Sequence, residues 1–296
     1  MLKAKRIPLK YIFLGTKWDM FYVSLVSVIA FLIFQVIDLP DMPIAIPAFL
    51  GTSISLVLGF KLSHSYDRWW EARKIWGAIV NDSRTLVIQA MNFANSESAS
   101  FSINRMAKRQ IAWCYSLGQS LRKLDPLENV KGKVSEEEWD YLKKHSNVPL
   151  AMMNKHGEDL SQLHQSGAIN DYQQIQVDQT LVRLVESMGK AERIKNTIFP
   201  TTYRIYLHIF IYIFVIMLAI SMADTVGWWE IPRLIFITLP FFLMEKTAYY
   251  LQDPFENRPS DTPVTAIART IEMNINQLIE SGEVKETTSN DKYYVM

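Results

Sequence analysis

The chain has 296 residues, of which 21% are charged, and its formal net charge at pH 7 is +1. This balance gives no electrostatic basis for binding nucleic acid, which proteins recognise through concentrated basic charge. The single cysteine, Cys114, excludes an intrachain disulfide, and its apolar setting predicts a buried structural thiol. The mean hydropathy of +0.02 would fit an ordinary soluble protein, but it averages long apolar segments with a polar middle region.

Four apolar segments are long enough to cross a bilayer. A span of the hydrocarbon core needs about 20 predominantly apolar residues. Such segments lie near residues 20–38, 43–62, 205–223 and 231–251. We therefore expect a membrane protein with four transmembrane helices in each subunit.

The spans divide the chain into five parts. These are a cytoplasmic N-terminal arm, transmembrane helices 1 and 2, a cytoplasmic helical domain, transmembrane helices 3 and 4, and a cytoplasmic C-terminal segment, at residues 1–19, 20–62, 63–204, 205–251 and 252–296 respectively. The N-terminal arm carries five Lys and Arg residues, whereas the turns within each pair of spans carry none. Short cytoplasmic loops are enriched in Lys and Arg, so both termini are expected in the cytoplasm.

The two turns are therefore expected on the outer side of the membrane. Asp38 and Asp41 in the first turn are candidates for the outer mouth of a membrane path. Trp228 and Trp229 in the second turn are expected at the outer interface, where amphipathic rings are favoured. The first span lacks a small-residue cleavage site, so a cleaved signal peptide is not expected.

The second span continues into polar sequence without a helix breaker. Residues 43–76 run from the apolar segment into a cluster around Arg68, Trp69 and Trp70 and then onward. We predict one continuous helix that crosses the membrane and enters the cytoplasmic domain. Trp and Arg at the end of a span anchor a helix at the interface, and Glu71 can pair with Arg68 or with a residue of another helix.

Residue spacing within the second span defines two stripes. Thr52, Leu56 and Phe60 recur every four residues and so lie one above another on a helix. A neighbouring stripe of small residues comprises Gly51, Ser55 and Gly59. Small residues at this spacing let membrane helices approach closely. If several copies surrounded an axis, rings of Leu56 and Phe60 would form a hydrophobic constriction that gates by dewetting; alternatively, both stripes pack within one subunit.

The middle region is predicted to be helical almost throughout. Apolar positions continue at helical spacing beyond the Trp cluster, and a second helix is expected over 101–124. Ser135 and Glu138 have the spacing of a capping box, and a further long helix is expected after Gly167. Strand signals are weak, so the predicted fold class is all-α.

Sequence motifs for enzyme chemistry are missing. The chain has no phosphate-binding glycine loop, no dinucleotide fingerprint, no CxxC pair and no HExxH. His145, His156 and His164 lack the spacing and the companion ligands of a metal site. We predict no catalytic residue, no cofactor and no metal ligand, and interpret these histidines as ordinary surface or core residues.

Three motifs far apart in the chain carry a family resemblance. They read SYDRWWEARKIWG at 65–77, ERIKNTIFPTTY at 192–203 and LQDPFENRPSDTPV at 251–264. In this order, and with four spans, they resemble the bestrophin family of ion channels in its bacterial branch. The resemblance implies a homopentamer in the bilayer of the bacterial inner membrane. It also implies one axial pore, lined by the second transmembrane helix, with a hydrophobic neck, a vestibule and a cytoplasmic aperture.

Residue by residue, the resemblance places the neck on the stripe already defined by spacing, Thr52, Leu56 and Phe60. Thr52 is polar where the family commonly has a bulky apolar residue, so the neck is expected to be two rings deep. The aperture falls near the start of the helix after Gly167. Its candidates are Ile169, Tyr172 and Ile175, with Tyr172 preferred.

The third motif departs from the animal members of the family, in which an acidic run forms a calcium clasp. Asp253 and Asp261 are retained here, but Arg258 stands where the clasp needs a carboxylate. A calcium ion requires about six or more oxygen ligands. We therefore expect no calcium requirement, and an ion pair of Arg258 with Asp253 or Asp261 in place of the metal.

Two classes of function remain open at this point, a channel for small monovalent ions and a membrane carrier or adaptor. A coupled carrier usually buries charged groups near the middle of the membrane, whereas Glu245 and Lys246 lie towards the cytoplasmic end of the last span. The family resemblance favours an anion channel of the chloride type. Asp38 and Asp41 favour the alternative, a channel for sodium or potassium ions.

Overall fold

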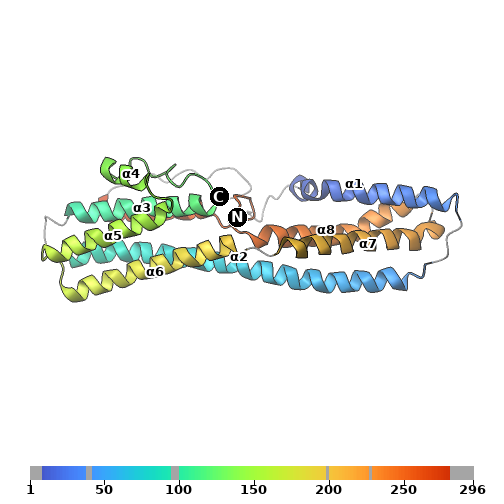
Figure 1. Cartoon of the computed structure of the whole chain (residues 1–296), viewed down its shortest axis with the longest axis horizontal. Helices are drawn as coiled ribbons and strands as arrows, with labels where there is room; N and C mark the ends of the chain where they lie inside the picture. The colour runs from blue at the N-terminus through green and yellow to red at the C-terminus, as the bar shows by residue number, and fades with distance from the viewer. Residues whose placement is uncertain (1–8, 38–41, 95–99, 198–199, 227–228, 281–296) are drawn as a thin grey trace. The chain divides into compact units, whose positions relative to one another are not determined.

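The structure, a computed structural model, describes residues 9–37, 42–94, 100–197, 200–226 and 229–280. Over these residues it consists of α-helices joined by turns, without a strand (Figure 1). The helices are α1 (Leu9–Phe34), α2 (Ala45–Phe93), α3 (Ser100–Leu121), α4 (Glu136–Leu142), α5 (Val148–Gln165), α6 (Asp171–Asn196), α7 (Thr201–Val226), α8 (Glu230–Gln252) and α9 (Val264–Glu280). The predicted all-α fold class is confirmed.

The helices divide into two compact units, which are described separately. The membrane unit contains α1, α7, α8 and the part of α2 up to Trp69. The polar unit contains α2 from Trp70 onward, α3 to α6, and α9. Each helix of the membrane unit is long and apolar enough to cross a bilayer, as the sequence predicted.

Helix α2 is unbroken over 49 residues, so the predicted continuity through the Arg-Trp-Trp cluster is confirmed. At 1.5 Å per residue its length is roughly 74 Å.

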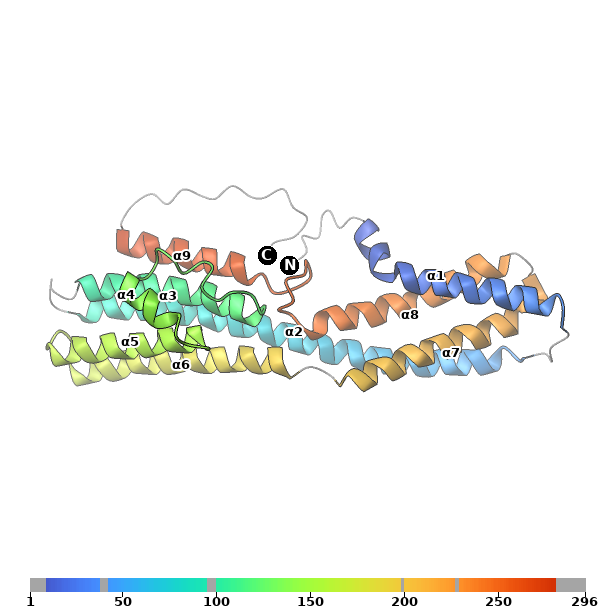
Figure 2. The ribbon, with the colours of Figure 1, turned by 45° about the horizontal axis from the view of Figure 1, so that its top comes forward.

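In the membrane unit, α1 packs against both α7 and α8, and α7 packs against α8 (Figure 2). Ile54 and Leu58 of α2 enter the same apolar core as Phe214 of α7 and Phe242 of α8. Gly51 permits this approach, because a Cβ there would lie 2.9 Å from the Phe214 ring.

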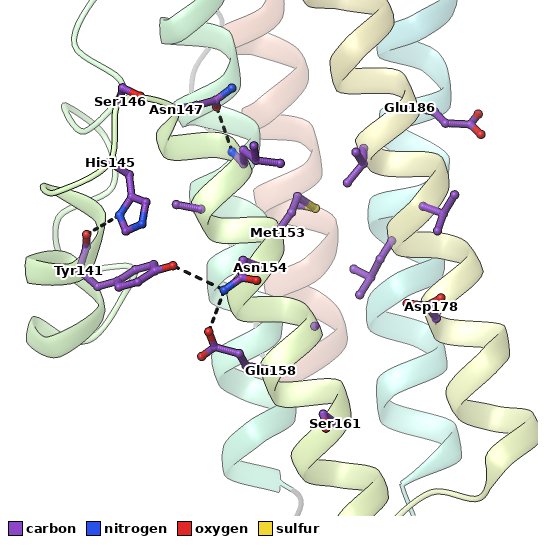
Figure 3. Close-up of a pocket in the computed structure, with 16 residues that line it drawn as sticks. Tyr141, His145, Ser146, Asn147, Met153, Asn154, Glu158, Ser161, Asp178 and Glu186 are labelled. Carbon is purple, nitrogen blue, oxygen red and sulfur yellow. Dashed lines mark hydrogen bonds between the residues drawn. The ribbon is translucent and has the colours of Figure 1, made fainter.

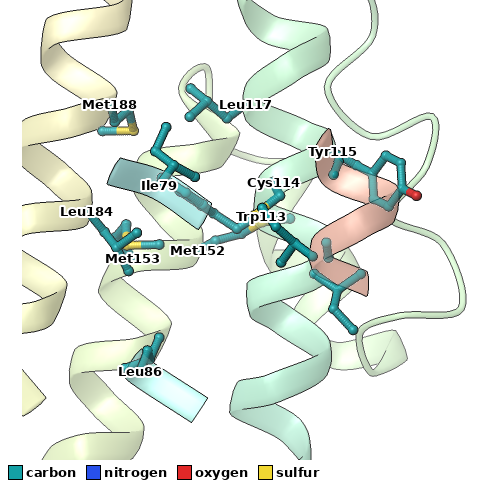
Figure 4. Packing of buried hydrophobic residues seen from close by; sticks show 14 of the residues in the cluster. Ile79, Leu86, Trp113, Cys114, Tyr115, Leu117, Met152, Met153, Leu184 and Met188 are labelled. Atoms are coloured by element: carbon teal, nitrogen blue, oxygen red, sulfur yellow. The ribbon is translucent and has the colours of Figure 1, made fainter. Parts of the chain in front are cut away.

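The core of the polar unit is built mainly on α3, which packs against α5, α6 and α9. Trp113 and Cys114 of α3 belong to this core, together with Met152 and Met153 of α5 and Met188 of α6 (Figure 4). Burial raises the pKa of the Cys114 thiol to about 12, so the thiol stays protonated and unreactive. The predicted structural role of Cys114 is confirmed by its burial.

Helix α9 is fastened to the polar unit by both packing and hydrogen bonds. A Cβ at Gly118 of α3 would lie 3.2 Å from Cγ2 of Val264, so α9 begins in close contact with α3. The Tyr115 hydroxyl donates a 2.6 Å hydrogen bond to Glu272, and Arg122 donates one of 2.6 Å to the Thr265 hydroxyl.

Some local predictions for the polar unit were wrong. The helix expected over 101–124 ends at Leu121, since Lys123 has a φ of 58°. Ser135 caps α4 by accepting the Glu138 N–H at 3.2 Å, but the Glu138 carboxylate is bound by Arg109 instead of the cap residue. A complete capping box, which was not predicted, lies at the start of α6, where Asn170 and Gln173 each accept a hydrogen bond from the other's backbone N–H.

Charged residues also lie inside the polar unit. Arg109 is 2% exposed and binds Glu138 through two guanidinium nitrogens. It also donates a 2.7 Å bond to Asp159, which accepts from the more exposed Arg105 as well. Breaking such a buried pair leaves an unpaired charge in the interior, which is costly.

His156 is fully buried beside this cluster, and neither ring nitrogen has a hydrogen-bond partner among the described residues. Burial, with the nearby Arg109 charge, lowers the pKa of His156 well below its usual value. Below about pH 6.5, His156 of the unfolded chain therefore binds a proton, whereas His156 of the folded chain stays neutral. The free energy of unfolding should keep its full value above that pH. Below it, the free energy should decline by about 1.4 kcal/mol per pH unit until the pH reaches the pKa of His156 in the folded chain.

This decline can be measured from thermal unfolding midpoints between about pH 7.5 and about pH 5.5. The matched variant is His156→Met, which cannot titrate and should show a shallower loss than the wild type. Parallel profiles for the two proteins would contradict a neutral buried imidazole.

Candidate pore-lining site

The stripe of Thr52, Leu56 and Phe60 on α2 is uncovered in the subunit. Leu56 is 62% exposed and Phe60 is 60% exposed, and Thr52 is also exposed. The helix instead turns Ile54 and Leu58, 3% and 0% exposed, towards the rest of the membrane unit. The alternative in which this stripe packs within its own subunit is therefore wrong.

The stripe of small residues behaves differently from expectation. Gly51 packs against Phe214 as described above, but Ser55 and Gly59 are exposed, and a Cβ at Gly59 would meet no atom within 4 Å. Ile54 and Leu58, with larger side chains, make the contacts to the core. Within this stripe, Gly51 is therefore the one residue that packs closely against another helix of the subunit.

The Arg-Trp-Trp cluster near the middle of α2 makes side-chain contacts within each unit. In the membrane unit, Arg68 donates a 3.0 Å bond to the carbonyl of Gln252, the last residue of α8, and Trp69 stacks on Tyr66. In the polar unit, Glu71 pairs with Arg193 of α6 at 3.0 Å. Of the partners considered for Glu71, the residue of another helix is the one observed.

A buried ion pair in the membrane unit was not found from the sequence. Lys61 on α2 is 2% exposed, and its Nζ lies 3.8 Å from the carboxylate of Glu245 on α8, which is 7% exposed. Each residue alone looks like a charge at the end of a span. Only the packing of two helices far apart in the sequence brings the two together.

The aperture candidates separate clearly by burial. Ile169 precedes α6 and is 5% exposed, as part of the polar unit's core. Tyr172 and Ile175, in the first turns of α6, are 85% and 55% exposed. Ile169 is therefore unsuitable as an aperture residue, because its side chain is committed to packing. Tyr172 and Ile175 remain candidates and lie three residues apart on one side of the helix.

The two outer-mouth candidates, Asp38 and Asp41, lie outside the described residues, as does Trp228. Trp229, which precedes α8, is 71% exposed.

The loop between α8 and α9 contains the residues compared with the calcium clasp. Asp253 and Asp261 are 6% and 3% exposed. The Asp261 carboxylate accepts the main-chain N–H of Arg258 at 2.9 Å and the hydroxyl of Ser260 at 3.3 Å. The Arg258 guanidinium lies 3.6 Å from Glu256. Arg258 thus pairs with a carboxylate of its own loop, Glu256, which was not among the partners expected.

Glu256 also accepts a 2.7 Å bond from Lys195 of α6. Two cations therefore neutralise this carboxylate, and internal donors occupy Asp261. We expect channel currents in a calcium chelator to match those in millimolar calcium, because these oxygens already have partners. Alternating the two solutions on one planar bilayer tests this, and a current that disappears with the chelator would contradict it.

A groove of about 1010 Å³ lies between α5 and α6 of the polar unit (Figure 3). Its polar side chains bind one another: Asn154 donates to Glu158 at 2.8 Å and contacts the Tyr141 hydroxyl at 3.5 Å. Across the described part of the chain, no three His, Cys, Asp or Glu residues are grouped as metal ligands would be.

Comparison with known proteins identifies a family and several similar chains. The model of the bacterial and fungal bestrophin proteins matches residues 12–277. A Nostoc protein named as a voltage-dependent anion channel-forming protein is 27% identical over 278 residues, which cover 90% of this chain and 89% of the relative. The Escherichia coli K12 protein YneE, with the same description, is 26% identical over 245 residues, covering 83% of this chain and 80% of YneE.

Among solved structures, a bacterial bestrophin homologue from Klebsiella pneumoniae superposes with a TM-score of 0.82 at 28% identity, covering 89% of this chain and 98% of that one. The match therefore extends over most of the chain. With a family model that extends over both units, the chain belongs to the bacterial and fungal bestrophin family.

Proposed function

We propose that this chain forms a homo-oligomeric membrane channel, a pentamer, which passes small monovalent ions and prefers anions such as chloride. Three features support this: membership of the family, the anion channel names of its relatives, and the uncovered stripe on α2. We place the protein in the bacterial inner membrane with both termini in the cytoplasm, because basic residues gather in the N-terminal arm.

The observation that carries the proposal is the exposure of Leu56 and Phe60. Both are large apolar side chains on a membrane helix whose opposite face is packed. Around a symmetry axis they form rings that narrow the path to an apolar neck, with Thr52 above them. Beyond the membrane, Tyr172 and Ile175 supply the aperture.

The alternative within the same fold is a channel for sodium or potassium ions. An apolar neck contributes little preference for the sign of the ion, so charges at the mouths decide it. Asp38 and Asp41, five copies of each in a pentamer, would enrich cations at the outer mouth. A carrier or adaptor is less well supported, because it gives the uncovered stripe no role.

The deciding experiment is the reversal potential of the purified protein in planar bilayers under a potassium chloride gradient. Reversal at the chloride potential supports the anion channel. Reversal at the potassium potential contradicts the anion preference, and Asp38→Asn with Asp41→Asn should then shift it. Absence of current from both the wild type and Leu56→Ala would contradict the channel itself.

A further inference from the structure

A pocket of about 230 Å³ lies within the membrane unit, at the end where α7 begins and α8 finishes. It is separate from the uncovered stripe on α2 and is lined from α1, α7 and α8. The lining contains five residues that can carry charge, Asp19, Arg204, His208, Glu245 and Lys246. Ionisable side chains gathered in a membrane-embedded unit commonly mark a functional site.

The two carboxylates of the pocket already have partners. Asp19 accepts a 3.3 Å hydrogen bond from the Tyr212 hydroxyl and lies 3.6 Å from Nε2 of His208. Glu245 lies 3.8 Å from the ammonium group of the buried Lys61. The negative charges are therefore engaged within the unit.

The two permanent cations have no such partners. Neither Arg204 nor Lys246 makes an ion pair with a carboxylate in the part of the chain that the structure describes. Both approach tyrosine rings instead. The Arg204 guanidinium carbon lies 4.6 Å from the centroid of the Tyr249 ring, and the Lys246 ammonium nitrogen lies 6.0 Å from that centroid and 5.7 Å from the centroid of the Tyr250 ring. A cation–π contact positions a cation but leaves its charge uncompensated. The pocket thus holds two positive charges near the ring of Tyr249.

We propose that this pocket binds a phosphate group, held between Arg204 and Lys246. A guanidinium matches phosphate oxygens with two parallel bonds, and an ammonium adds a point charge. The volume suffices, since a water molecule takes about 30 Å³ and a phosphate group has only five heavy atoms.

The surroundings indicate a phospholipid as the carrier of this phosphate. Ile205 and Ile209 line the pocket on the α7 side and are 49% and 47% exposed. This apolar face continues along the helix to Ile213 and Ile216, which are 41% and 45% exposed. Acyl chains can lie along this surface while the headgroup reaches the cations. Free phosphate offers the same headgroup chemistry without the chains.

The test is calorimetric titration of the purified full-length channel in a neutral detergent. The probes are dihexanoyl phosphatidylglycerol, dihexanoyl phosphatidylcholine and inorganic phosphate. We expect the anionic lipid to bind most tightly. Arg204→Gln and Lys246→Gln should each weaken it about fivefold, and the double variant about 25-fold, since a cation near an anionic lipid contributes about 1 kcal/mol. The matched control is Arg233→Gln, which removes an exposed cation near the other end of α8 and should leave the affinity unchanged.

Weaker binding of phosphatidylglycerol by Arg204→Gln and Lys246→Gln, with unchanged binding by Arg233→Gln, supports the proposal. If inorganic phosphate binds as tightly as phosphatidylglycerol, the pocket is a phosphate site, but the proposal that a lipid carries the phosphate is overturned. Equal weakening by Arg233→Gln, or unchanged binding in both single variants, overturns the site. If the double variant does not fold, the single variants decide. The titration needs no current, so its result is independent of the ion selectivity and of the proposed channel function.

Discussion

Alanine at both Leu56 and Phe60 is expected to raise the single-channel current by at least about tenfold. A narrow apolar ring expels water, so an ion must shed hydration to pass it. Both side chains are uncovered in the subunit, at 62% and 60% exposure, so their removal widens the neck without opening a cavity in the core. Lowering the barrier by about 1.4 kcal/mol is enough for a tenfold gain. Single-channel recording of the double variant in planar bilayers measures it.

The matched control is Val57→Ala on the same helix. Val57 is 38% exposed and lines an apolar groove between α2 and α7, away from the stripe. Its variant should conduct like the wild type. The reversal potential of the neck variant should also stay unchanged, because neither lost side chain carries charge. A current unaltered by the double substitution would contradict the assignment of the neck.

Replacing Arg109 with methionine should cause the largest loss of stability among the substitutions considered. Arg109, Glu138 and Asp159 are 2%, 5% and 5% exposed. Removal of the guanidinium leaves Glu138 buried without its charged partner, which costs about 3–5 kcal/mol. A loss of this size lowers the unfolding midpoint by roughly 10 °C. Thermal unfolding of the purified protein, followed by tryptophan fluorescence, measures the shift.

Arg105→Met is the control for this experiment. Its side chain also binds Asp159 but is 30% exposed, so the loss should stay within about 1 kcal/mol. Adding Glu138→Gln to Arg109→Met should restore part of the stability, because it removes the unpaired negative charge. Similar midpoints for the two arginine variants would show that burial does not govern the strength of this cluster.

The helices themselves could be predicted from the sequence because their signals are local. Apolar length identified all four spans, and the lack of a breaker after Phe60 predicted the continuity of α2. These predictions depend on neighbouring residues only, and the structure confirms them. Four-residue spacing defined the stripe of Leu56 and Phe60 but left its surroundings open, and it did not identify Ile54 and Leu58 as the packed face.

The features that were missed depend on contacts between distant segments. Ile169 was an aperture candidate because it lies next to a helix start, but its side chain is buried in the core of the polar unit. Lys61 and Glu245 meet only after α2 and α8 have packed. Arg109 diverts the carboxylate of Glu138 from the expected capping box. In each case a partner far away in the sequence decides the side chain's role.

The position of α9 has a consequence for the order of events during synthesis. The face of α3 that includes Gly118 is covered by a helix that begins at Val264, after the last membrane span. The polar unit is therefore incomplete while the ribosome is still making α7 and α8. A nascent chain that stops before α9 displays bare apolar surface on α3, the kind of surface that chaperones and proteases recognise. Only chains that have been translated beyond their last span can therefore complete the polar unit and enter an assembly.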